Sequence, residues 1–539
     1  MRASVKFGSN TGAPLVCRLV MCLYGTKQAS LEWNREVNYT LTVKLGFRRS
    51  VCDPCLYIKL SRSGRLMMIA LFVDDLVTTL AVEDRAEWAE LQAIFMARYR
   101  CKTLGAVRSL LGMRIERDRQ QRTMRIDQTV FIETLLQQQK MTNCKPSDTP
   151  SRPGVSLAAV AEAEQRVTID GSQQQADVIQ AFQSVVGSAM YVTNCTLAVA
   201  SHAVNQLARG MANPARANLE AGTKLLRWLA GAKTTALIID CSQPPLLHEG
   251  NAASSVCTMP DTVDDPLRQP RPLQTECVQI TAHTDADWGG CQSTRCSTTG
   301  FVIQIFGSTV VWSSRRQKTV ALSSTEAEYG ALADVTKELL WMHQLLAEMG
   351  LRSTPPMVES EPEPSSTPSS ITLAASSSSA SSKCACVTPI YSDNQSAIAQ
   401  CVGLSDYHAR SKHVDIRHHF VKAVVRRGEV QLRWVPTAQQ IADVFTKPLD
   451  APTFRRMTEL VMGVQSSRPS RGSKPIQEIQ IQIQSNSKEL HAKRSEAASR
   501  SCIEDEAKTK QHRSEDRRGE SYAVSVVSPG LEVHSLTLR

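Results

Sequence analysis

Between residues 278 and 450 the sequence predicts three strands, a helix, a strand, two helices, a strand and a last helix. Apolar residues alternate or run continuously in the strands, and they recur every three or four residues in the helices. Only one segment interrupts this order, a serine- and proline-rich stretch at 354–386 that cannot build a core. If the strands form a single mixed sheet, this part of the chain has an α/β (mixed α+β) fold.

Four acidic residues fall on this pattern where a metal site could form. Asp285 lies in the first strand, Glu326 begins the long helix, Asp393 ends a later strand, and Asp443 lies in the last helix. Hydrolysis of a phosphodiester by two metal ions needs several carboxylates that converge on one point. Mg²⁺ prefers carboxylate and water oxygens, so no histidine or cysteine is required.

Each of these acids also has a purely structural interpretation. Ser323 and Glu326 have the spacing of a helix capping box, and so do Thr325 and Glu328. Asp393 could cap a helix, Asp443 could be an exposed helix charge, and Asp285 could be a solvated residue at a strand end. Taken singly, each residue favours the structural interpretation, whereas their order along the chain favours the metal site.

Longer blocks around these acids are similar to one known family. Residues 281–449 resemble the ribonuclease H domain of copia-type retrotransposon Pol polyproteins, in the blocks AHTDADWGG, RCSTTGFVIQIFGSTVVWSSRRQKTVALSSTEAEYGAL, IYSDNQSAI, SKHVDIRHHFVKAVVRRGEV and QQIADVFTKPL. The resemblance implies two Mg²⁺ (or Mn²⁺) ions and cleavage of the RNA strand of RNA–DNA hybrids. Its metal-binding acids fall on Asp285, Glu326, Asp393 and Asp443, with Asp287 and Glu328 as second choices.

Residues 411–427 predict a basic helix. Ile416, Phe420 and Val424 form an apolar line along it, and five cations lie largely off that line: Lys412, Arg417, Lys422, Arg426 and Arg427. A solvated charged face explains them as well as a phosphate-contacting face does. Next to a nuclease-like domain we expect these cations to bind the backbone of a hybrid.

Two adjacent aspartates mark the front of the chain. Asp74 and Asp75 lie between apolar strands at a predicted hairpin tip, where a divalent metal would compensate their repulsion; an ordinary acidic turn is the alternative. The blocks VCRLVMCLYGTKQASLEWNREVNYTLTVKLGF, DPCLYIK and LFVDDLVTT resemble the copia-type reverse transcriptase palm. That resemblance implies that Asp74 and Asp75 are catalytic metal ligands. It also implies a third aspartate upstream, and residues 1–16 contain no acidic residue, so we expect an incomplete, inactive polymerase.

Composition and resemblance together divide the chain into five parts. These are a partial reverse transcriptase palm without fingers or first palm motif (1–107), a thumb/connection region (108–239), a linker (240–277), a ribonuclease H-like domain with a five-stranded mixed sheet, flanking helices and the insertion 354–386 (278–450), and a disordered basic tail (451–539).

The net charge of +10 favours a polyanionic partner, and no apolar run is long enough to span a membrane. The 16 scattered cysteines are typical of free thiols in a reducing, intracellular setting. The resemblance implies hybrid and template–primer partners, leaves room for other Pol- or Gag-derived chains, and is compatible with a cytoplasmic virus-like particle or the nucleus. A decayed, catalytically silent transposon remnant and a nucleic-acid-binding protein without catalysis are the alternatives.

Overall fold

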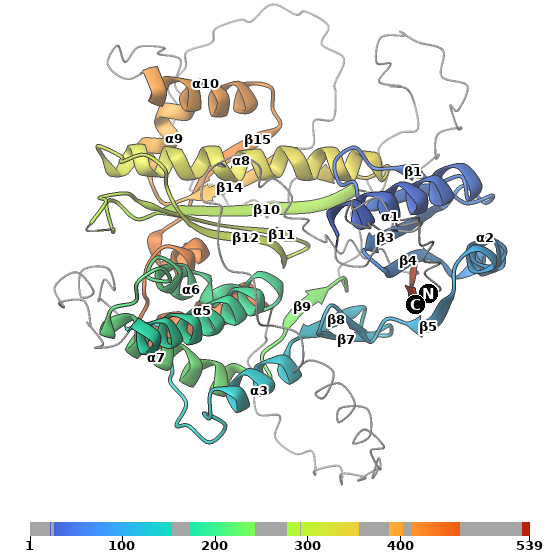
Figure 1. Cartoon of the computed structure of the whole chain (residues 1–539). Helices are drawn as coiled ribbons and strands as arrows, with labels where there is room; N and C mark the ends of the chain where they lie inside the picture. The colour runs from blue at the N-terminus through green and yellow to red at the C-terminus, as the bar shows by residue number, and fades with distance from the viewer. Residues whose placement is uncertain are drawn as a thin grey trace, which may run out of the picture. The chain divides into compact units, whose positions relative to one another are not determined.

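The computed structural model describes residues 22, 26–152, 172–242, 277–291, 293–354, 387–402, 412–463 and 531–538 (Figure 1). Most of the predicted linker 240–277 and of the predicted insertion 354–386 lies outside these residues, as does the tail from 464 to 530. In the described part of the chain, no helix is both long enough and apolar enough to cross a membrane.

The front of the chain forms a sheet in the order β1-β2-β3-β4-β16-β5. A helix and a π-helical turn precede this sheet, and another helix lies between β4 and β5. The bounds are α1 (Lys27–Tyr39), η1 (Thr40–Lys44), β1 (Arg48–Arg49), β2 (Leu56–Leu60), β3 (Leu66–Phe72), β4 (Asp75–Ala81), η2 (Val82–Asp84), α2 (Arg85–Arg98), β5 (Cys101–Ala106) and β16 (Leu531–Leu538). β2 and β3 form a hairpin, with Gly64 at φ 79° in its turn.

The tail that the sequence predicts to be mostly disordered contains one strand, β16. This strand pairs antiparallel with both β4 and β5. Each of those strands would otherwise present unpaired backbone N–H and C=O groups at an open edge, and β16 satisfies both edges. The composition of the tail concealed this strand because backbone pairing leaves little trace in composition.

The next part of the chain combines a small antiparallel sheet, β6-β7-β8-β9, with a group of helices. A turn in which Leu111 and Gly112 adopt positive φ angles separates β6 from β7. The bounds are β6 (Ser109–Leu110), β7 (Met113–Asp118), β8 (Thr123–Asp127), α3 (Thr129–Gln138), α5 (Ser172–Cys195), η3 (Ala198–Ala200), α6 (Ser201–Ala208), α7 (Arg216–Ala232) and β9 (Leu237–Asp240).

The third sheet has the order β12-β11-β10-β14-β15, so the predicted five-stranded mixed sheet is confirmed. Its strands are β10 (Cys277–Ala286), β11 (Thr298–Ile305), β12 (Ser308–Arg316), β14 (Thr388–Ser392) and β15 (Val430–Trp434). β10, β11 and β12 are antiparallel neighbours, whereas β14 runs parallel to β10 and β15 runs parallel to β14. A short strand, β13 (Arg352–Thr354), also pairs with the start of β10.

The two faces of this sheet pack into different cores. On one face lie α8 (Ser324–Glu348), α9 (Gln395–Val402) and α10 (Lys412–Arg426), and α8 runs along β10 (Figure 1). The predicted apolar stripe of α8 is confirmed, since all five of its members are at most 1% exposed: Leu332, Val335, Leu339, Met342 and Leu346. On the other face Val302 packs with side chains of α5, α6 and α7.

Two predictions about the end of this region are corrected. Asp443 does not lie in a long last helix but in a short 3₁₀ helix, η5 (Ile441–Phe445), which follows another, η4 (Thr437–Gln439). Beyond it, the predicted tail begins with a helix, α11 (Ala451–Met462), which Asp450 caps and which ends at Gly463 with φ 70°. Four apolar residues on one side bury this helix in the core: Phe454, Met457, Val461 and Met462.

Candidate metal centre

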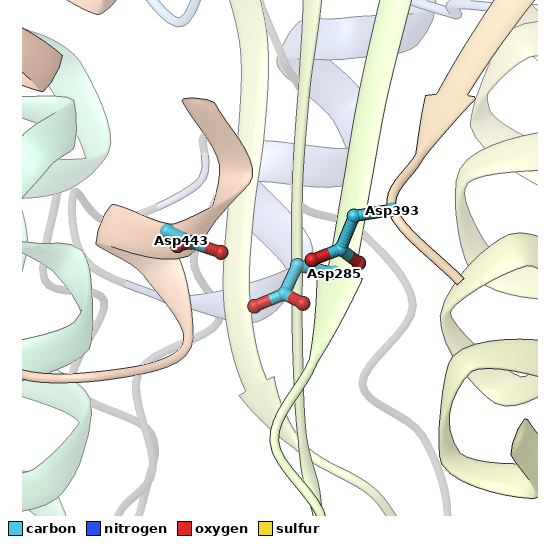
Figure 2. Close-up of side chains that lie close together, drawn as sticks. All are labelled: Asp285, Asp393 and Asp443. Carbon is cyan, nitrogen blue, oxygen red and sulfur yellow. The ribbon is translucent and has the colours of Figure 1, made fainter. Parts of the chain in front are cut away.

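Three carboxylates from three different elements meet beside the five-stranded sheet (Figure 2). Asp285 lies near the end of β10, Asp393 follows the last residue of β14, and Asp443 lies in η5. One oxygen from each lies within 4.8 Å of the others. Asp285 and Asp443 are buried, with 4% and 5% of their surfaces exposed, and Asp393 is half-buried. The parallel strands β10 and β14 bring Asp285 and Asp393 together because they end at the same edge of the sheet.

The segment from 437 to 447 fixes these carboxylates. The Thr446 hydroxyl donates to Asp285 Oδ2, and the Thr437 hydroxyl donates to Asp393 Oδ2 over 2.7 Å. Lys447 Nζ lies 2.9 Å from Asp443 Oδ1 and 3.8 Å from Asp285 Oδ2. The sequence did not indicate a role for Thr437, Thr446 or Lys447, although Thr446 and Lys447 lie in the block QQIADVFTKPL.

A glycine in β11 lets this segment approach the sheet. Gly300 pairs with Asp285 across the two strands. A Cβ atom at position 300 would lie 2.6 Å from Thr446 Cγ2 and 2.7 Å from Phe445 Cβ, much too close for carbon atoms. The buried Gln440 side chain completes the junction, because its amide donates to the Thr284 carbonyl over 2.9 Å. Only a residue without a side chain at 300 permits this approach.

The electrostatics of the cluster suit a divalent cation. Burial, and then the negative charge of Asp285, raise the pKa of Asp443 to about 7, although Lys447 acts in the opposite direction. Burial alone would lower the pKa of Lys447, but Asp285 and Asp443 outweigh burial and raise it. Buried oxygen ligands that repel one another are the donor set that Mg²⁺ and Mn²⁺ prefer. The residues therefore fit the ions that the sequence predicted.

The fourth acid beside this cluster is Glu328, not the predicted Glu326. Glu328 is 5% exposed, and its Oε1 accepts a hydrogen bond from Ala286 N over 3.3 Å. Its Oε2 is buried with no hydrogen-bond partner among the residues that the structure describes. Burial, and then the charges of Asp285 and Asp393, raise the pKa of Glu328 to about 10.

Glu326 has the capping role that was the alternative interpretation of its spacing. Its backbone N–H donates to Ser323 Oγ over 3.1 Å, and its Oε2 accepts from Leu322 N over 2.8 Å. Residues two apart on a helix do not share a face, so Glu326 points away when Glu328 points toward the cluster. The geometry therefore favours Glu328, a second choice from the sequence, over Glu326 as the fourth acid near the cluster, and metal binding by either residue stays a prediction.

Asp287, the other second choice for a metal ligand, connects the loop that follows β10 with the first residue of β11. Its Oδ1 accepts a hydrogen bond from Thr298 N, and burial raises its pKa to about 6. Like those of Glu328, its oxygens are not among those that group with Asp285, Asp393 and Asp443. Its hydrogen bond with the Thr298 backbone gives Asp287 a structural role.

The predicted phosphate-binding cations of α10 fall into three groups. Lys422 is only 7% exposed, next to the fully buried Val421, so its assignment to a phosphate-contacting surface is wrong. The apolar line of the helix is wider than predicted, because Val421 is buried in the same core as Val424. Arg426 and Arg427 are exposed as predicted, although Arg427 pairs with Glu429. The remaining two side chains lie outside the described residues: Lys412 and Arg417.

The hairpin with Asp74 and Asp75 has the predicted form. β3 ends at Phe72 and β4 begins at Asp75, so Val73 and Asp74 make the turn. Val73 has φ 55°, which a β-branched residue rarely adopts. The Trp33 indole stabilises this turn by donating to the Val73 carbonyl over 2.6 Å. Among the described residues no third carboxylate groups with Asp74 and Asp75, and their role as metal ligands stays a prediction.

Comparisons with known proteins show what the chain is similar to. Residues 1–153 match the reverse transcriptase (RNA-dependent DNA polymerase) family. The chain is 28% identical over 448 residues to the retrovirus-related Pol polyprotein from transposon TNT 1-94 of Nicotiana tabacum. This alignment covers 83% of this chain and 28% of that protein. The chain is 29% identical over 456 residues to the Pol polyprotein from transposon RE1 of Arabidopsis thaliana, with 84% and 25% covered. The chain thus spans about a quarter of the length of these relatives.

Two solved ribonucleases H also match part of the chain. One is LC11-RNase H1 isolated from compost, at 14% identity and a TM-score of 0.21, which covers 31% of this chain and 92% of that one. The other is the N-terminal RNase H domain of a Mycobacterium tuberculosis protein, at 12% identity and a TM-score of 0.19, with 34% and 97% covered. The resemblance predicted from the sequence is confirmed: over most of its length this chain is similar to the Pol polyproteins of copia-type transposons, and its front part carries the reverse transcriptase family match.

Proposed function

We propose that this chain cuts the RNA strand of RNA–DNA hybrids with divalent metal ions held by Asp285, Glu328, Asp393 and Asp443. The observation that carries the proposal is the trio of carboxylates within 4.8 Å of one another, two of them almost fully buried. Keeping such charges together out of water is unfavourable without a cation. A polymerase that copies RNA into DNA produces an RNA–DNA hybrid, so the family of the front part suggests this substrate.

Each residue of the site has a defined task in this proposal. Bound metal ions would activate the attacking water and stabilise the leaving oxygen. Asp285, Asp393 and Asp443 supply ligand oxygens from three elements, so the site requires the folded sheet. Thr446 and Thr437 orient two of these carboxylates, and Lys447 balances part of the negative charge. The 2′-hydroxyl of the substrate would distinguish RNA from DNA.

The full chain should cleave the RNA strand of a labelled hybrid with Mg²⁺ or Mn²⁺ and lose this activity with a chelator. Glu328→Gln and Glu326→Gln form a matched pair, since both replace one carboxyl group with an amide in the same helical turn. A ligand contributes several kcal/mol to the transition state, so Glu328→Gln should lower kcat/KM by about a hundredfold or more. Glu326→Gln should retain activity within about threefold, because a helix cap acts mainly on stability, by about 1 kcal/mol.

The results would also separate the alternative functions. Equal losses of cleavage activity in both glutamine variants would show that Glu328 is wrongly assigned to the site. A folded wild-type chain that binds the hybrid but cleaves nothing at millimolar Mg²⁺ would support a nucleic-acid-binding protein without catalysis. A chain that neither binds nor cleaves would support a decayed remnant.

We propose further that the front sheet holds template–primer nucleic acid near Asp74 and Asp75. The reverse transcriptase family match and the ordered β3–β4 hairpin support this role. Binding of a labelled primer–template can be measured by anisotropy with Ca²⁺ present and absent. If Asp74 and Asp75 make a metal-dependent contact, Asp74→Ala/Asp75→Ala should lose the part of the affinity that depends on Ca²⁺. If the turn is purely structural, the effect of the double substitution should not depend on Ca²⁺.

A further inference from the structure

The chain has seven tryptophans, all of them among the described residues. Five are buried or half-buried, and two are exposed: Trp288 at 61% and Trp434 at 51%. Trp288 is close to the carboxylate cluster in the sequence, and Trp434 is close to it in space. Trp288 follows Asp285 by three residues, and the Trp434 indole contacts the backbone of Asp393.

Hydrogen bonds hold both indoles in place. Trp434 Nε1 donates to the Asp393 carbonyl over 3.2 Å, and Trp288 Nε1 donates to the Ala321 carbonyl over 3.1 Å. The polar edge of each ring is therefore satisfied by the protein, while a large part of each ring remains open to solvent. A ring held in this way loses little conformational freedom when a ligand binds it.

The sheet places the two rings on either side of the middle strand of the site. β10, β14 and β15 are parallel neighbours in that order, so their carboxyl ends lie along one edge. Trp288 comes two residues after β10, Asp393 follows β14, and Trp434 ends β15. Neighbouring strands are about 4.8 Å apart, so the two strands that lead to the tryptophans are separated by about twice that distance, with Asp393 on the strand between them.

Exposed apolar groups extend this surface near Trp288. Its indole is bonded to the segment between β12 and α8, where Val320 is 46% exposed and Leu322 is 82% exposed. The acids at the centre can bind metal ions, and they can hold a phosphate only through such ions. The apolar rings at the edge can take the faces of sugars and bases, which every nucleic acid offers regardless of its sequence.

We propose that Trp288 and Trp434 are substrate-binding residues that contact sugar and base faces of the RNA–DNA hybrid on either side of the phosphate to be cut. This inference rests on the proposed function, because it takes the hybrid as the occupant. It assigns the two residues a role in binding and not in the chemical step, so their loss should act on KM and leave kcat nearly unchanged.

Binding can be measured separately from cleavage in the full chain carrying Asp443→Asn. In that background, Trp288→Ala and Trp434→Ala should each weaken binding of a fluorescent hybrid by about tenfold in an anisotropy titration, the typical effect of one lost aromatic contact. Trp434→Phe keeps an aromatic face but cannot donate to Asp393, so it should retain most of the affinity. Val402→Ala removes an apolar side chain that is 60% exposed on α9 and should have no effect.

A second measurement covers variants that fold poorly. The hybrid should quench the intrinsic fluorescence of the Asp443→Asn chain, and Trp288→Phe/Trp434→Phe should abolish this quenching while five tryptophans remain. Unchanged quenching in the double variant, or alanine variants that bind within twofold of their parent, would overturn the inference. If the wild-type chain cleaves while the alanine variants bind normally, only this inference fails. If the tryptophans govern binding but no variant or wild-type chain cleaves, only the proposed function fails.

Discussion

Asp443 is one of the residues through which the acid cluster couples to pH. Burial and the neighbouring Asp285 raise its pKa to about 7 in the folded chain, whereas an unfolded aspartate has a pKa of about 3.9. Between these two values the folded chain binds more protons than the unfolded chain. The free energy of unfolding therefore falls as pH rises from about 4 to about 7, and a bound divalent ion should offset this loss.

The metal-free chain should show this dependence relative to Asp443→Asn, which cannot titrate at that position. We expect the difference in melting temperature, wild type minus variant, to decrease steadily from pH 4.5 to pH 7.5 in the presence of a chelator. Added Mg²⁺ at pH 7.5 should stabilise the wild type more than the variant. Parallel melting curves for both chains across this range would show that Asp443 keeps an ordinary pKa.

At the same scale, the acids on strands were easier to predict than the acid on the helix. Asp285 and Asp393 lie at strand ends that a parallel pair must bring together, and the structure joins them with Asp443. Glu326 and Glu328 both fit a capping box, so spacing alone did not separate them. Helical phase could have done so, because Glu328 lies four residues before Leu332 and continues the buried stripe of α8. The contacts of Lys447 and Thr446 with the cluster depend on the approach of the 437–447 segment, which has no local signature.

At the scale of elements, periodicity predicted the strands and helices that bury a continuous face. α8 and the five strands of its sheet follow one another in the order that the sequence predicts. The misses are short or dependent on partners. The 3₁₀ helix η5, with five residues, is too short to show a hydrophobic period. The helix α11 was missed because the sequence after residue 463 is polar and the whole tail was treated as one segment. β16 exists only through its pairing with β4 and β5.

The insertion between β13 and β14 allows a prediction about an element. β13 pairs with β10 up to Gln279, and β14 pairs with the same strand from Ala282 onward, so a short connection can replace what lies between. Replacing residues 357–384 with a linker of about four residues shortens the connection about fourfold. Loop closure then costs about 1 kcal/mol less, so the melting temperature should stay the same or rise slightly, and cleavage should persist. A loss of several degrees would mean that the insertion packs on the domain.

At the scale of the whole molecule, one buried core crosses the boundaries that the sequence predicted. It joins α5, α6 and α7 to β11, η5 and α11. Trp312 of β12 donates to the Thr193 carbonyl over 2.9 Å, and Asn205 of α6 donates to the Ser314 carbonyl over 2.7 Å. The second face of the five-stranded sheet would thus be uncovered in an isolated fragment of residues 278–450. We expect that fragment to be less stable than one that spans residues 108–463.

Phe454 tests whether this core unfolds as one unit. It is 6% exposed on α11, and its ring packs edge-on against Trp228 of α7 at a centroid distance of 5.9 Å. Phe454→Ala should cost about 3–5 kcal/mol, the usual range for a buried phenylalanine. Leu460→Ala, on the same helix but 49% exposed, should change stability by no more than about 0.5 kcal/mol. Because the core that contains Phe454 also contains Val444 and Phe445 beside Asp443, cleavage and near-ultraviolet circular dichroism should be lost at the same lowered temperature in Phe454→Ala. If cleavage survives the loss of the aromatic signal, the helices of the connection region and the metal centre unfold independently.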